Sequence, residues 1–177
     1  MEFGSAPEGR VILFIIPNEM YRQSILQLVS AMTKKFKNLC FITLNRPHYA
    51  LVDDFKKMNI DIKRLFFIDA VTKKTTENIK VLLVSSPRAF LELNTGIEEI
   101  IVGSGADCFI FDSLSTLLLY GDSLGVARMV HMMAMKIRSE KLHGVFTCLE
   151  KDISSSLVSD ISMFSDEVIY AGRGKYV

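Results

Sequence analysis

Apolar residues occur along this chain in short continuous runs, and the stretches between the runs mix apolar and polar positions at helical spacing. Continuous apolar runs are typical of strands that are covered on both faces, as in a parallel sheet between helices. On this basis we expect strands at residues 11–16, 39–44, 65–68, 81–84, 108–111, 144–148 and 167–170.

The stretches between these runs predict amphipathic helices. At 49–58, for example, Leu51, Phe55 and Met58 repeat at helical spacing and share one face. The expected helices lie near residues 19–36, 49–58, 87–103, 124–141 and 153–163. Because strands and helices alternate, the pattern predicts βαβ units and an α/β fold with a mostly parallel sheet.

Turn residues agree with these boundaries. Residues 45–47 (Asn-Arg-Pro) are expected to start a helix, and residues 85–87 (Ser-Ser-Pro) to cap the next one. Residues 103–105 (Gly-Ser-Gly) are expected to end that helix. Residues 69–80 form the most polar connection and are expected to be a loop.

Length and composition favour one globular domain. The chain has 177 residues, of which 49% are hydrophobic and 23% charged, and its net charge is +1. This charge balance gives no overall attraction to nucleic acid or to an anionic membrane, so we expect neither as a partner. The apolar runs are far shorter than the roughly 18 residues that a membrane helix needs. Residues 1–9 are polar, look like a cloning remnant with an N-terminal tail, and do not resemble a signal peptide.

The cysteine pattern predicts neither a disulfide framework nor a metal site. Cys40, Cys108 and Cys148 are far apart and form no C-x-x-C pair or Cys/His cluster. Each falls in a predicted buried strand, where free cysteine behaves as a small hydrophobic residue. We therefore expect a reducing compartment, the cytoplasm.

Asp112 and Ser113 are the clearest candidates for chemistry. They follow a buried predicted strand, which places them at the carboxyl edge of the sheet, where ligands bind in open α/β folds. In nucleotide-hydrolysing α/β proteins, an aspartate at this place orients a magnesium-bound water. An aspartate or serine after a strand is also a common helix cap, and this segment alone leaves both interpretations open.

The turn after the first predicted strand is where nucleotide-binding α/β proteins hold phosphate. That turn uses glycines, so that backbone amides can surround the phosphates, together with a lysine and a serine or threonine. Here it reads Pro17, Asn18, Glu19, Met20, Tyr21, Arg22, Gln23 and Ser24. No glycine occurs from Arg10 to Thr95, where average usage would give about six. Met20 and Tyr21 would crowd the phosphate position, and Arg22 is most simply an exposed residue of the first helical turn.

Several features of the second half of the chain occur in a recognisable order. A segment at 85–91 with Ser-Ser-Pro and Phe-Leu leads into a helix, and a later strand ends in Asp-Ser-Leu at 112–114. A long helix and another strand follow, and residues 166–169 read aspartate, any residue, valine, isoleucine. In this order the chain resembles the KaiC-like branch of the RecA-type P-loop ATPases, over about residues 11–176 and most closely from residue 81. The resemblance implies a single domain over residues 10–177, with a three-layer α/β/α RecA-like architecture.

The chain departs from that family where the family's chemistry is carried. The family's glycine-rich loop with Lys-Thr has no counterpart in residues 17–24. Its glutamate pair after the second strand corresponds to Asn45 and Arg46, neither of which is a carboxylate. Only Asp112 and Ser113 remain. We therefore expect no catalytic residue, no metal site and no ATP hydrolysis, and ATP with Mg²⁺ is a disfavoured ligand.

These departures predict a degenerate KaiC/RecA-like domain, a pseudoenzyme that acts as a regulatory or scaffolding module. The resemblance implies protein partners, either a second copy or related RecA-type domains, and an archaeal setting. The alternative is a regulatory protein that binds ATP or another phosphate ligand through an altered loop, with Arg22 in place of the lysine.

Residues 121–125 match the G-x-S-x-G pattern of serine esterases, with Ser123 as the nucleophile. Residues 117–120 could supply the preceding strand, but no Asp-x-x-His arrangement follows, and His131 lies in the helix that starts at this turn. A turn that caps the next helix is the favoured interpretation. In that helix, Met129, Met132 and Met133 are expected mainly in the core, while Met135 widens the apolar surface toward a possible partner site.

Overall fold

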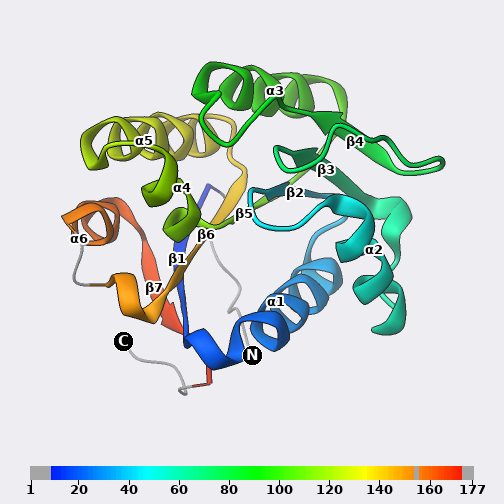
Figure 1. Cartoon of the computed structure of the whole chain (residues 1–177), viewed down its shortest axis with the longest axis horizontal. Coiled ribbons are helices and arrows are strands. Elements are labelled where there is room, and N and C mark those ends of the chain that lie inside the picture. The colour runs from blue at the N-terminus through cyan, green and yellow to red at the C-terminus, as the bar shows by residue number, and fades with distance from the viewer. Residues whose placement is uncertain (1–8, 154–155, 173–177) are drawn as a thin grey trace.

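A computed structural model describes residues 9–153 and 156–172. Its centre is a seven-stranded sheet in the order β4-β3-β2-β5-β6-β1-β7, and every neighbouring pair is parallel (Figure 1). The strands are β1 (Val11–Ile16), β2 (Leu39–Thr43), β3 (Leu65–Asp69), β4 (Lys80–Leu83), β5 (Cys108–Asp112), β6 (His143–Leu149) and β7 (Glu167–Tyr170). Each overlaps one of the predicted apolar runs. Cys40, Cys108 and Cys148 are buried and free, as expected.

Helices cover both faces of the sheet, which confirms the three-layer α/β/α arrangement. They are α1 (Tyr21–Lys35), α2 (His48–Lys57), α3 (Phe90–Gly103), α4 (Leu114–Tyr120), α5 (Ser123–Ser139) and α6 (Ser156–Phe164). Short 3₁₀ turns are η1 (Asn18–Met20), η2 (Ile62–Arg64) and η3 (Glu150–Asp152). One apolar cluster joins the sheet to α1 and α2, and a second joins it to α3, α4, α5 and α6 (Figure 1).

The structure excludes one possible interpretation of the sequence and shows that one local prediction is wrong. The segment that contains residues 117–120 is part of helix α4 and not a strand, because Leu114 and Leu117 bury one helical face in the core. Residues 85–87 do not cap α3: that helix begins at Phe90 after Ala89, without a side-chain cap. Instead, Ser85 donates through its backbone N–H and its hydroxyl to the Glu92 carboxylate, both at 2.8 Å.

The register of the sheet brings buried polar residues together at its carboxyl edge. Thr43, at the end of β2, is paired with Asp69 on one side and with Asp112 on the other. Thr147 lies on β6, one position beyond the pair formed by Phe111 and Phe146. All four polar side chains are fully buried. This row of carboxylates and hydroxyls is the framework of the site described below.

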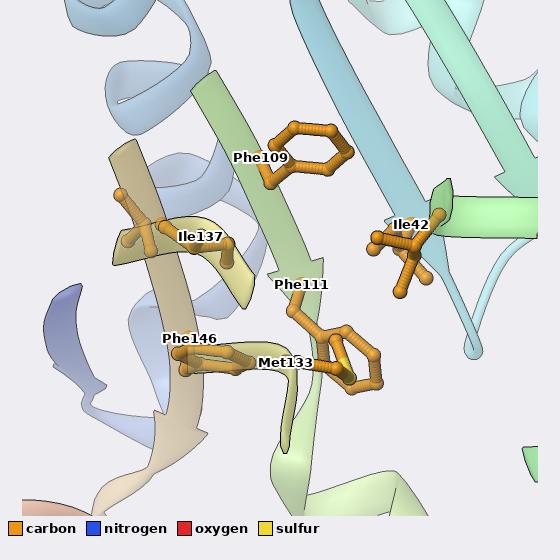
Figure 2. Close-up of a pocket in the computed structure, with 9 residues that line it drawn as sticks. Ile42, Phe109, Phe111, Met133, Ile137 and Phe146 are labelled. Carbon is orange, nitrogen blue, oxygen red and sulfur yellow. The ribbon is translucent and has the colours of Figure 1, made fainter. Parts of the chain in front are cut away.

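A small apolar cavity of about 10 Å³ lies between the sheet and α5 (Figure 2). Ile42, Phe109, Phe111 and Phe146 line it from the strands, and Met133 and Ile137 from the helix. Gly144 also lines it, and a Cβ at that position would come within 2.7 Å of the Ile137 side chain. The helix therefore lies close to β6 because position 144 is a glycine.

We expect Ile137→Ala to lower the free energy of unfolding by about 2–5 kcal/mol, because it enlarges this cavity. The control is Met132→Ala on the same helix, whose side chain is 61% exposed and whose loss should cost about 0.5 kcal/mol or less. Urea unfolding of both variants measures the difference. Equal costs would show that α5 does not depend on this contact.

Candidate functional site

The connection from β1 to α1 is a tight turn in which backbone amides are already bonded. The Met20 N–H donates to the Pro17 carbonyl at 3.0 Å, and the Tyr21 N–H donates to the Asn18 carbonyl. The chain thus passes from strand to helix through one 3₁₀ turn. Two backbone N–H groups of the turn therefore donate to carbonyls of the same turn.

The eight residues of this turn have different environments. Asn18, Glu19, Arg22 and Gln23 are exposed, and Pro17, Met20 and Tyr21 are half-buried. Ser24 is fully buried, and its hydroxyl has no hydrogen-bond partner within the part of the chain that the structure describes. Arg22 is exposed in the first turn of α1, as the sequence predicts.

Tyr21 joins this turn to the predicted aspartate. Its hydroxyl lies 2.7 Å from Oδ1 and 2.6 Å from Oδ2 of Asp112, and it donates to that carboxylate. The Thr147 hydroxyl, on β6, donates to Asp112 Oδ1 at 3.1 Å. The Asn45 amide donates to the Tyr21 oxygen at 3.0 Å. Four segments distant in sequence therefore meet at Asp112.

Burial dominates the electrostatics of this cluster. It raises the pKa of Asp112 to about 6, although hydrogen bonds from Tyr21, Thr147 and Asn45 and the charge of Arg46 act in the opposite direction. Burial and the nearby Asp112 charge raise the pKa of Tyr21. At neutral pH the tyrosine is therefore the proton donor and the carboxylate the acceptor.

Asn45 and Ser113 extend the network into α4. The Thr116 hydroxyl donates to Asn45 Oδ1, and the Asn45 amide lies 3.4 Å from the Ser113 oxygen. Ser113 is the N-cap of α4, and its side chain accepts from the Thr116 N–H at 3.3 Å. The peptide bond between Asp112 and Ser113 is cis. Ser113 is thus a helix cap, whereas Asp112 is the centre of a buried polar cluster.

Arg22 and Arg46 do not point to Asp112 but share Asp54 on α2. The Arg22 guanidinium makes two hydrogen bonds to the Asp54 carboxylate, one of them through Nε at 3.1 Å. Arg46 donates to the same carboxylate at 2.8 Å. The Arg22 hydrogen bond is the largest cause of the lowered pKa of Asp54. Both cations nearest the turn are therefore engaged by one carboxylate, whose side chain is only 5% exposed.

A second buried cluster at the same edge was not predicted from the sequence. Asp69 accepts from the backbone N–H and from Nδ1 of His48, both at 2.7 Å, and also from the N–H groups of Val71 and Thr72. Nε2 of His48 lies 2.9 Å from the Thr76 hydroxyl. The one signal available in the sequence was an aspartate directly after an apolar run. The cluster holds the 69–80 loop against the sheet.

The region around Ser123 has the geometry of a turn and not of a nucleophile elbow. Asp122 caps α5 by accepting from the Gly125 N–H at 2.8 Å, and helix α4 precedes the turn where an elbow needs a strand. The His131 ring packs edge-on against Phe164 at 5.3 Å between centroids. The prediction of a capping turn is confirmed. Over residues 9–153 and 156–172, no group of three or more His, Cys, Asp and Glu side chains could hold a metal ion.

Comparison with known proteins identifies the fold. No family model matches this sequence, and neither does any curated protein. The crystal structure of a KaiC-like protein from the hyperthermophilic archaeon Pyrococcus horikoshii is similar, with a TM-score of 0.69 and 11% sequence identity. The match covers 94% of this chain and 73% of that chain. The chain therefore has a KaiC/RecA-like fold. None of the helices in the described ranges is long and apolar enough to cross a membrane.

We expect Tyr21→Phe to lower the free energy of unfolding by about 1–3 kcal/mol at pH 8, because a buried carboxylate loses its closest donor. The Asp112 pKa is already above its unfolded value of 3.8, so ionisation of Asp112 destabilises the fold as the pH rises toward 6. The Tyr21 hydrogen bond offsets part of this effect only where Asp112 is ionised. The cost of Tyr21→Phe should therefore shrink as the pH falls below about 6.

Urea unfolding at pH 5 and pH 8 measures this dependence. Tyr49→Phe is the matched control, because Tyr49 is 43% exposed on α2 and should contribute little at either pH. A cost for Tyr21→Phe that is the same at both pH values would exclude a role of Tyr21 in holding the ionised carboxylate.

Proposed function

We propose that this protein is a non-catalytic KaiC/RecA-like domain that acts as a regulatory or scaffolding module through protein–protein contacts. The observation that carries the proposal is the hydrogen bond from the Tyr21 hydroxyl to both oxygens of Asp112. In a P-loop enzyme, the carboxylate at this edge faces the metal and the phosphates. Here it faces a phenol from the turn that should hold the phosphates, and its side chain is 0% exposed.

The geometry of the turn supports the same proposal. A phosphate cradle needs several backbone N–H groups that point to a common centre. In this turn the N–H groups of Met20 and Tyr21 are bonded to carbonyls of the same turn. Against the pattern G-x-x-x-x-G-K-[ST], residues 17–24 keep only the final hydroxyl, Ser24, and have Gln23 at the lysine position. The two glycine positions are occupied by Pro17 and Arg22.

The identity of Asn45 and Arg46 also argues against ATP hydrolysis. They stand where the resemblance implies a pair of glutamates that activate the attacking water. Asn45 bonds with Tyr21, Ser113 and Thr116, and Arg46 bonds with Asp54. Neither side chain can accept a proton from water at neutral pH. The proposal therefore includes no catalytic residue and no metal.

The proposed partners are a second copy of this chain or related RecA-type domains. The proposed location is the cytoplasm, which agrees with three buried free cysteines. The similar structure comes from an archaeon, and an archaeal setting is part of the proposal.

We expect ATP with Mg²⁺ to show no binding in the micromolar range by isothermal titration calorimetry, and no phosphate release above background. The closed turn and the engaged carboxylate leave no cradle for a triphosphate. Asp112→Asn is the control, and it should give the same null titration. Micromolar binding to the original chain that is lost in Asp112→Asn would overturn the proposal.

A second candidate is a regulatory protein that binds ATP or another phosphate ligand through this altered turn. Two observations favour it: helix α1 has no side-chain cap at its N-terminus, and the buried Ser24 hydroxyl has no partner among the described residues. Under this candidate, Arg22 would leave Asp54 and pair with phosphate. Weaker phosphate binding in Arg22→Ala, with no change in Lys34→Ala at the other end of α1, would distinguish it from the scaffold.

A further inference from the structure

Helices α5 and α6 are neighbours on the face of the sheet opposite to α1 and α2 (Figure 1). Their side chains form an open groove. Its volume is about 460 Å³, within the range of sites that accept a group of side chains or a small ligand. The residues that line this α5–α6 groove are Ala127, Arg128, His131, Asp160, Met163 and Phe164.

Large apolar side chains are exposed in and beside this groove. Met163 on α6 is 84% exposed, and Met132 and Met135 on α5 are 61% and 54% exposed. Met129 and Met133 are buried, as the sequence predicts, but the expectation that Met132 lies in the core is wrong: its side chain is exposed, and so is that of Met135. Methionine adapts its shape to a partner surface, and exposed apolar groups that lie together are typical of interaction sites.

The groove contains two charged residues of opposite sign, and neither has an ion-pair partner among the described residues. Arg128 lies on α5 and Asp160 on α6, and within the described ranges neither forms an ion pair. Their neighbours, in contrast, are engaged: Lys136 with Glu140 at 3.0 Å, and Arg138 with Asp166 at 3.1 Å. Among the described residues, the groove therefore presents one cation and one anion without an ion-pair partner, beside an apolar surface.

We propose that the α5–α6 groove is the contact surface for a second copy of this chain, related to the first by a twofold axis. In such a dimer the same patch faces itself, so Arg128 of each copy meets Asp160 of the other, and both charges are paired at once. Met163 of each copy inserts against Ala127 and Phe164 of the opposite groove. This inference rests on the proposed function, because it names the surface by which the module pairs with itself.

The mixed charge of the groove favours this occupant over others. Nucleic acid or an anionic membrane would bind a surface that is uniformly positive. An acidic or a basic peptide would leave one of the two charges of the groove unpaired. Only a partner with the opposite arrangement of charges satisfies both, and a second copy turned by the twofold axis has that arrangement. Like charges that face each other at these contacts would disfavour association.

Sedimentation velocity over a range of concentrations tests the proposal. We expect the original chain to dimerise, and Arg128→Asp and Asp160→Arg to weaken the dimer by about tenfold or more each, because each variant places like charges across both symmetric contacts. Mixing the two single variants places opposite charges at both contacts again, so a heterodimer should form where neither variant dimerises alone. A merely misfolded variant would not be rescued in this way.

Two matched controls separate the groove from general surface effects. Lys34→Asp reverses a charge on the opposite face of the sheet, and Met58→Lys changes an exposed methionine at the end of α2; neither should affect the dimer. Met163→Lys should weaken it. Circular dichroism verifies that each variant is folded.

A chain that stays monomeric up to millimolar concentration would overturn this inference, and so would a dimer that is insensitive to both charge reversals. In the second case the protein pairs through another surface, and the proposed module function stands. The ATP titration is independent of this outcome, so failure of the groove and failure of the non-catalytic proposal are distinguishable.

Discussion

The structure depends on the burial of an ionisable carboxylate at the carboxyl edge of the sheet. Asp112 is fully buried, and a carboxylate removed from water is costly unless donors surround it. Tyr21 from α1 and Thr147 from β6 supply donors, and Asn45 from the loop after β2 supports the tyrosine oxygen. The requirement therefore fixes where the first turn of α1 lies relative to β5 and β6.

A second buried carboxylate, Asp69, lies two strands away from Asp112 at the same edge, and other donors satisfy it. Asp69 is in register with Thr43, which is in register with Asp112, so the two carboxylates share one row of the sheet. Asp69 is satisfied by His48 and by the amides of the loop that follows it. Both clusters therefore place a buried, hydrogen-bonded carboxylate at the edge where ligands bind in open α/β folds. Networks in which each polar group has a partner also make such an edge rigid.

Local patterns in the sequence predicted the elements, and nonlocal contacts determined the site. Apolar runs located the seven strands, because strands covered on both faces carry few polar residues. Helix α4 was missed because a segment of seven residues, Leu-Ser-Thr-Leu-Leu-Leu-Tyr, is too short for periodicity to distinguish helix from strand. The absence of a glycine-rich turn was visible in residues 17–24. That Tyr21 reaches Asp112, 91 positions away, depends on the tertiary arrangement and has no signal in either segment.

The tyrosine–aspartate contact also has an evolutionary consequence. A glycine in place of Tyr21 would leave the buried Asp112 with one donor fewer. Loss of the tyrosine therefore costs stability before any new binding could compensate. Position 21 is therefore less free to vary than the exposed residues of the same turn, Asn18, Glu19, Arg22 and Gln23.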